Sequence, residues 1–127
     1  MDLGNNPSTV IVGSGMSTPV SELCCSPVLA GPLPPEAAAD LAAALKVVAD
    51  PARLRLLGLI RSQPEGEACT CDLTEPLGLS QPTVSHHLKV LYEAGFLNRE
   101  RRGRQTYYRI APNSLSVLCQ ALDPSAI

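Results

Sequence analysis

The stretch "LSQPTVSHHLKVLYEAGFL", residues 79–97, decides the fold of this chain. Ser80 is a favoured helix cap, Pro82 suits the first helical turn, and Gly95 ends the helix. The apolar stripe at helical spacing consists of Val84, Leu88 and Leu91. The opposite face carries short hydrogen-bonding side chains and one lysine, a composition that suits a helix reading DNA bases.

The neighbouring segments indicate a winged helix-turn-helix. A short helix over about Cys71–Leu77 precedes this stretch and ends at Gly78, which leaves a tight turn between two helices. Residues 96–100 and 105–111 have the pattern of two strands around the turn "RRGR" at 101–104. A basic hairpin in this position forms the wing.

Three more helices are expected, within residues 34–50, 51–63 and 112–122. The apolar face of the second consists of Leu54, Leu57 and Ile60. The predicted fold class is therefore mainly α, a winged helix-turn-helix domain over residues 34–123. Residues 1–33 are rich in Gly, Ser, Pro and Asn, so we expect a flexible N-terminal tail that carries Cys24 and Cys25.

Charge is unevenly distributed along the 127 residues. The whole chain has a net charge of −2, which by itself argues against binding to nucleic acid. Between Ser80 and Ile110, however, six basic residues stand against two acidic ones, which gives +4. A local basic patch of this kind is the electrostatic footprint of a DNA-binding surface.

Several classes of protein do not fit the sequence. No apolar run approaches the roughly 20 residues of a membrane-spanning helix, and the N-terminus lacks the pattern of a secretory signal. We therefore expect a cytoplasmic protein without a membrane partner, in which closely spaced cysteines bind metal or do redox chemistry. No Ser-His-Asp or phosphate-loop arrangement indicates an enzyme or a small organic substrate.

The polar helix face and the hairpin predict contacts with double-stranded DNA. The side chains expected to contact it are Gln81, Thr83, Ser85, His86, Lys89, Arg102, Arg104 and Gln105. Residues near the start of such a helix usually touch bases, and hairpin arginines reach the backbone or the minor groove. For the helix alone, a solvated polar face is the alternative. His86 and His87 diverge by about 100° on a helix, which disfavours a shared metal ion.

The segments "ALKVVADPARLRLLGLI", "EACTCDL", "LSQPTVSHHLKVLYEAGFL" and "RRGRQTYYRI" resemble the ArsR/SmtB family of metal-responsive bacterial repressors, over about residues 36–122. The resemblance implies a winged-helix homodimer joined through its first and last helices. It also implies that the apo form binds operator DNA and leaves it when metal binds. The matching interface positions are Leu41, Leu45, Leu115, Leu118 and Leu122.

The same resemblance assigns a role to the cysteines. Cys69 and Cys71 match the thiolates of a metalloid site, while Thr74 stands where the enterobacterial type of arsenic sensor adds a third cysteine. Cys24 and Cys25 can complete the site, as N-terminal cysteines of one subunit do for the other in the cadmium- and lead-sensing branch. The expected inducer is As(III) or Sb(III), since As(III) is soft and takes three thiolates. Cd(II) or Pb(II) stays open as the alternative.

Helix geometry raises a conflict at the cysteine pair. Residues two apart on a regular helix lie about 200° from each other, so Cys69 and Cys71 cannot both face one ion unless the helix start frays. We therefore expect metal binding to pull the pair together and deform the helix. Two other functions stay open: a thiol redox sensor that uses one of the two cysteine pairs, and a protein-interaction module without DNA.

The last helix carries the fifth cysteine. Cys119 lies beside Leu118, and a free cysteine is often a small buried hydrophobe, so we expect it to be buried. The family can also hold zinc on this helix through Asp and His. That site is excluded, because the chain has no histidine after His87.

Overall fold

The computed structural model describes residues 31–123, so the predictions for the tail, including Cys24 and Cys25, lie outside the described residues. The elements are α1 (Pro35–Val48), α2 (Pro51–Ser62), the 3-10 helix η3 (Pro64–Gly66), β1 (Glu67–Cys69), α3 (Thr70–Leu77), α4 (Gln81–Glu93), β2 (Leu97–Arg102), β3 (Gln105–Ile110) and α5 (Ser114–Leu122). This order confirms the mainly α, winged helix-turn-helix fold.

Local sequence signals set the helix boundaries. Asp50 accepts a hydrogen bond from the backbone N–H of Arg53 (3.1 Å) and caps α2. Ser80 accepts one from the N–H of Thr83 (3.4 Å) and caps α4 in the same way. Gly78 has φ +70° at the end of α3, a left-handed conformation that favours glycine and turns the chain between the two helices.

The core is aliphatic and is built around α4, whose predicted apolar stripe is confirmed. Its fully buried members are Val84, Leu88 and Leu91. Leu57 and Ile60 of α2 are buried too, but Leu54 is 56% exposed, so its expected place on the same face is wrong. Leu56 is buried instead, because the side of α2 that contacts α3 and α4 runs through positions 56, 57 and 60.

The wing, the hairpin of β2 and β3, belongs to a three-stranded antiparallel sheet in the order β1-β3-β2, one strand more than the sequence predicted. β2 and β3 form the expected hairpin. β1 is the additional strand, and it pairs with β3 through Glu67↔Arg109, Ala68↔Tyr108 and Cys69↔Tyr107. The pairing brings the cysteine motif against the wing.

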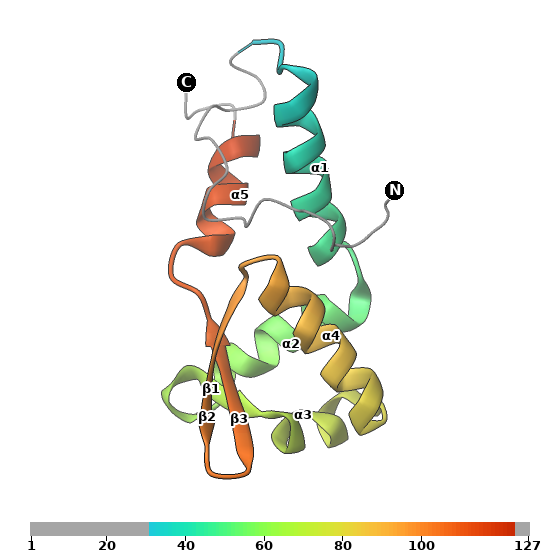
Figure 1. Cartoon of the computed structure of the whole chain (residues 1–127), viewed down its shortest axis with the longest axis vertical. Coiled ribbons are helices and arrows are strands. Elements are labelled where there is room, and N and C mark those ends of the chain that lie inside the picture. Colours follow the sequence, from blue (N-terminus) through green and yellow to red (C-terminus); the bar gives the residue numbers. More distant parts are fainter. Residues whose placement is uncertain (1–30, 124–127) are drawn as a thin grey trace.

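The two ends of the molecule carry different elements. α1 and α5 lie side by side at one end, while α3 and the turn of the wing lie at the other (Figure 1). Among the predicted interface leucines, three are partly buried: Leu41, Leu45 and Leu115. Leu122 is 47% exposed, whereas Leu118 is 5% exposed and belongs mainly to this chain's own core. None of the helices in residues 31–123 is long and apolar enough to cross a membrane.

Candidate DNA-binding surface and cysteine site

The polar face of α4 is open to solvent. Its exposed side chains include all five that the sequence assigned to DNA on this helix: Gln81, Thr83, Ser85, His86 and Lys89. The Thr83 hydroxyl lies 2.9 Å from that of Ser80, so the helix cap also orients this side chain. Because the buried stripe fixes the opposite face in the core, this face is available to enter a groove. Contact with DNA itself stays a prediction.

His87 points away from that face, toward the corner between α1 and α2. Arg53 Nη1 lies 3.2 Å from His87 Nδ1, and Arg53 Nε donates to the carbonyl oxygen of Val47. Burial lowers the pKa of His87 below its usual 6.5, although Asp50 acts in the opposite direction. The ring centres of His86 and His87 are 5.8 Å apart, and the ring planes are tilted by 56°. His86 is exposed, whereas His87 is partly buried.

The arginines at the tip of the wing differ in their hydrogen-bond and ion-pair partners. Arg104 and Gln105 are exposed, and Arg104 makes no hydrogen bond or ion pair with any residue in 31–123. Arg101 donates from Nε to the carbonyl oxygen of Gly103 (2.9 Å). Arg102 is held by carboxylates. Arg104 is therefore the readier partner for a DNA phosphate in this conformation.

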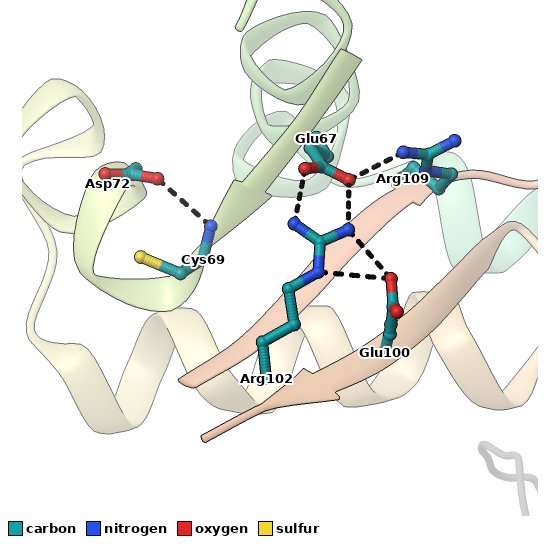
Figure 2. Close-up of polar contacts among 6 residues, drawn as sticks. All are labelled: Glu67, Cys69, Asp72, Glu100, Arg102 and Arg109. Atoms are coloured by element: carbon teal, nitrogen blue, oxygen red, sulfur yellow. Dashed lines mark hydrogen bonds and ion pairs between the residues drawn. The ribbon is translucent and has the colours of Figure 1, made fainter. Parts of the chain in front are cut away.

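Glu67 is the centre of an ionic cluster between β1 and the wing (Figure 2). Arg102 donates from Nη1 to Glu67 Oε2 (2.6 Å) and from Nη2 to Glu67 Oε1 (2.9 Å), and it also pairs with Glu100 (2.7 Å). Arg109 donates to Glu67 Oε1 (2.6 Å). The hydrogen bonds from Arg102 and then Arg109 lower the pKa of Glu67 to about 2. Sequence reasoning missed this cluster, because the two arginines lie 35 and 42 residues from Glu67.

Cys69 and Cys71 meet at the junction of β1 and α3. Cys69 ends the strand with extended backbone (φ −87°, ψ 167°) and occupies the position before the first residue of the helix. Cys71 lies in the first helical turn; the two Cα atoms are 5.3 Å apart, and the sulfurs form a disulfide. The conflict expected on a regular helix does not arise, because Cys69 is not helical. The expectation that α3 must deform to bring the sulfurs together is therefore wrong.

The reduced pair would provide two soft ligands for a metal. Within residues 31–123, one group of three metal-ligating side chains has all its ligand atoms within 4.8 Å of one another: Cys69, Cys71 and Asp72. Asp72 offers a hard carboxylate oxygen, and its Oδ2 already accepts a hydrogen bond from the N–H of Cys69 (3.1 Å). The pair thus fits a thiophilic metalloid with two of the three thiolates it needs, and the third sulfur must come from elsewhere.

The two sulfurs of the pair differ in access. Cys69 is 2% exposed, whereas Cys71 is exposed and its Sγ lies 3.8 Å from Oε1 of Gln105, next to the turn of the wing. The site therefore opens toward the wing. Cys119 is exposed, so its expected burial is wrong; the neighbouring Leu118 faces the core in its place.

Comparisons with known proteins agree with this architecture. Residues 50–99 match the model of the "Bacterial regulatory protein, arsR family". The chain is similar to the arsenical resistance operon repressor of Staphylococcus xylosus, with 38% identity over 84 residues that cover 66% of this chain and 78% of that protein.

Two solved structures share the fold. The crystal structure of the AntR antimony-specific transcriptional repressor has a TM-score of 0.59 and 30% identity, and the match covers 69% of this chain and 78% of that chain. The solution structure of the homodimeric winged helix-turn-helix DNA-binding domain Mb0332 from Mycobacterium bovis has a TM-score of 0.56 and 28% identity, with 70% and 82% covered. The motif order, the wing and these similarities agree, and the chain belongs to the ArsR family of bacterial regulatory proteins.

Proposed function

We propose that the chain is a transcriptional repressor that responds to arsenite or antimonite. Its apo homodimer binds operator double-stranded DNA and leaves it when the metalloid binds cysteine thiolates. The observation that carries the proposal is the meeting of Cys69 and Cys71 at the start of α3, the first helix of the helix-turn-helix. Similarity to an arsenical resistance operon repressor and to an antimony-specific repressor supports the choice of inducer.

The proposed ligands are sulfur atoms. Reduced Cys69 and Cys71 supply two, and Cys24 or Cys25 supplies the third, because As(III) prefers three soft thiolates to the hard carboxylate of Asp72. Four thiolates would suit Cd(II) or Pb(II) instead, so these cations are the alternative inducers.

The proposed assembly uses the end of the molecule opposite the wing. α1 and α5 carry the partly buried leucines and the exposed Leu122, which a second copy would cover. The homodimeric state of the similar Mycobacterium bovis domain supports this arrangement. A repressor of this kind works where its DNA is, so we place it in the cytoplasm.

Release from DNA tests the proposal. The reduced full chain is bound to the DNA upstream of its own coding sequence, and arsenite, antimonite, cadmium or lead is added in a gel-shift or anisotropy titration. Cys69→Ser and Cys71→Ser should each bind DNA but resist arsenite, whereas Cys119→Ser should respond as the wild type does. Wild-type protein that stays on the DNA with all four ions would refute the metal-responsive function.

The tail ligands and their subunit are tested separately. Replacing both Cys24 and Cys25 by Ser should abolish the arsenite response and reduce the sulfur neighbours of bound arsenic from about three to two in X-ray absorption. Mixing this variant with a Cys69/Cys71 double variant should restore one site per heterodimer if the site bridges subunits. A heterodimer whose bound arsenic still has only about two sulfur neighbours would place the whole site within one subunit.

The disulfide between Cys69 and Cys71 favours a second candidate, a thiol redox sensor. In its switching step the two thiols lose two protons and two electrons, the S–S bond forms, and hydrogen peroxide is reduced to two waters. Peroxide would then release the reduced protein from DNA, and a dithiol reductant would restore binding. Release from DNA by arsenite under reducing conditions, together with no release by peroxide, would favour the metalloid-responsive repressor and exclude the redox sensor.

A further inference from the structure

Glu67 joins β1 to both other strands of the sheet. Its direct cross-strand partner Arg109 lies on the central strand β3, whereas Arg102 lies on β2, at the far edge. The ion pair of Glu67 with Arg102 therefore crosses the central strand and connects two strands that are not hydrogen-bonded neighbours. Backbone pairing alone does not make this connection.

Arg102 of this ion pair also lies over Tyr107, which is the cross-strand partner of Cys69. The guanidinium carbon of Arg102 is 4.6 Å from the ring centre of Tyr107, and Tyr107 is the register partner of Cys69. Residues directly opposite each other in an antiparallel sheet project to the same face, and so do residues two apart on one strand. Glu67, Tyr107 and Arg102 thus form a continuous layer on the face that begins at Cys69.

Glu67 differs from the other carboxylate that holds Arg102. The side chain of Glu67 is 12% exposed, against 66% for Glu100. A carboxylate with so little access to water depends on its ion-pair partners more than an exposed one does. The exposed Glu100 can replace its ion pair with Arg102 by hydrogen bonds to water at little cost in free energy.

We propose that Glu67 is the positioning residue that transmits ligand binding at the cysteine pair to the wing, an inference that rests on the proposed function. In the DNA-binding form Glu67 holds Arg102 and Arg109 over the sheet. A third sulfur that joins the site pulls on the end of a three-residue strand, and Glu67 passes the shift to both strands of the wing. The arginine surface then fits the DNA less well, and affinity falls.

The experiment compares Glu67→Gln with Glu100→Gln in the full chain. Each removes one carboxylate partner of Arg102, but only Glu67→Gln breaks the connection to β1. The dissociation constant for DNA is measured with and without arsenite, and bound arsenic per chain is measured on the same samples. Circular dichroism and thermal melting check that each variant is folded.

The expected results separate the two variants. Arsenite should weaken DNA binding of the wild type and of Glu100→Gln by a factor in the usual allosteric range of about 5–150. Glu67→Gln should bind as much arsenic as the wild type, and whatever its DNA affinity without arsenite, arsenite should change that affinity by less than about twofold. A wild-type response in Glu67→Gln would overturn the inference, as would an equal loss in both variants.

A second variant and a hydrogen-exchange measurement test the same coupling. If Glu67→Gln does not fold, replacing Arg102 and Arg109 together by Gln removes both ion pairs of Glu67 from the other side, and an arsenite response of normal size in that variant would contradict the proposal. If arsenite does not change the DNA affinity of the wild type, the proposed function fails. Hydrogen exchange of the β2 amides then tests whether Glu67 couples the cysteine pair to β2. Peroxide oxidation of Cys69 and Cys71 should change that exchange in the wild type and in Glu100→Gln but not in Glu67→Gln; any other pattern overturns the inference.

Discussion

His86 and His87 occupy neighbouring positions on α4 but have different surroundings. His86 is exposed on the polar face, whereas His87 packs against Arg53 with 3.2 Å between Nη1 and Nδ1. Arginine only donates hydrogen bonds, so this contact requires His87 Nδ1 to be without a proton. Protonation of His87 would break the contact and place two cations side by side.

We expect the stability of the domain to fall below pH 6.5 because of His87. Burial, the main cause of its lowered pKa, makes the folded state bind this proton less readily than the unfolded state, whose pKa is the ordinary 6.5. Stability rises with pH wherever the unfolded state binds more protons, so this contribution is present above 6.5 and is lost as the pH falls. Urea unfolding of the wild type and His87→Gln at a fixed protein concentration, from pH 8 to 5, measures the difference.

His87→Gln should flatten the profile, and His86→Gln, which changes an exposed side chain, should keep the wild-type profile. Identical profiles for the wild type and His87→Gln would show that this contact has no part in acid sensitivity.

The two arginines at the turn of the wing should contribute unequally to DNA binding. Arg104→Ala should weaken binding to all duplexes alike and reduce the slope of log affinity against log salt by about 0.9, the value for one phosphate contact. Arg102→Ala should reduce the slope by less, because Glu67 and Glu100 already offset the charge of Arg102. Anisotropy titrations at several salt concentrations give both slopes. A larger change for Arg102→Ala would mean that DNA displaces the carboxylates.

Sequence patterns predicted single residues well where one helix decides their environment. The outward placement of Ser85 and Lys89 follows from the buried stripe of the same helix. The placement of Cys69 did not follow, because a rotation of 100° per residue applies only inside a helix and Cys69 lies just before one. Glu67 gave no signal at all, since its partners are distant in sequence.

The turn between α3 and α4 depends on one left-handed residue. Gly78→Ala should lower the free energy of unfolding by about 1 kcal/mol, because an alanine is strained at φ +70° although its Cβ would meet nothing within 4 Å. Gly58→Ala, in the exposed interior of α2 and equally without a steric neighbour, should raise it by about 0.5–1 kcal/mol. Urea unfolding curves of both variants test the contrast. A neutral effect at Gly78 would contradict the left-handed turn.

All five α-helices and the hairpin of residues 31–123 could be predicted from periodicity, caps and turn residues, whereas the 3-10 helix η3 was not. The strand β1 could not, because three residues are too few to show alternation and its partners on β3 lie 38 to 42 residues further along. This miss also hid the contact between the cysteine site and the wing. Non-local pairing of a short strand is set by the assembled fold, not by the segment itself.

On the scale of the whole molecule, the proposed dimer should depend on Leu122. This side chain is 47% exposed on α5, seven residues from Leu115 and thus on the same helical face. Leu122→Glu should raise the dimer dissociation constant by at least about tenfold, because burial of a leucine contributes about 1.5–3 kcal/mol. Gln120→Glu adds the same charge to the opposite face of α5 and should leave the dimer intact. Analytical ultracentrifugation measures both, and an unchanged dimer in Leu122→Glu would exclude this face.

The pairing of β1 with β3 has a mechanical consequence. The chain runs from β1 through α3 and α4 into β2 and β3, and β3 returns to pair with β1, so residues 67–110 form a closed linkage. An open chain of hinged parts has a separate degree of freedom at each joint, whereas a closed linkage of this size loses most of them. We therefore expect α4 and the wing of one subunit to shift together when β1 moves, with the ion pair of Glu67 and Arg102 carrying the shift directly from β1 to β2.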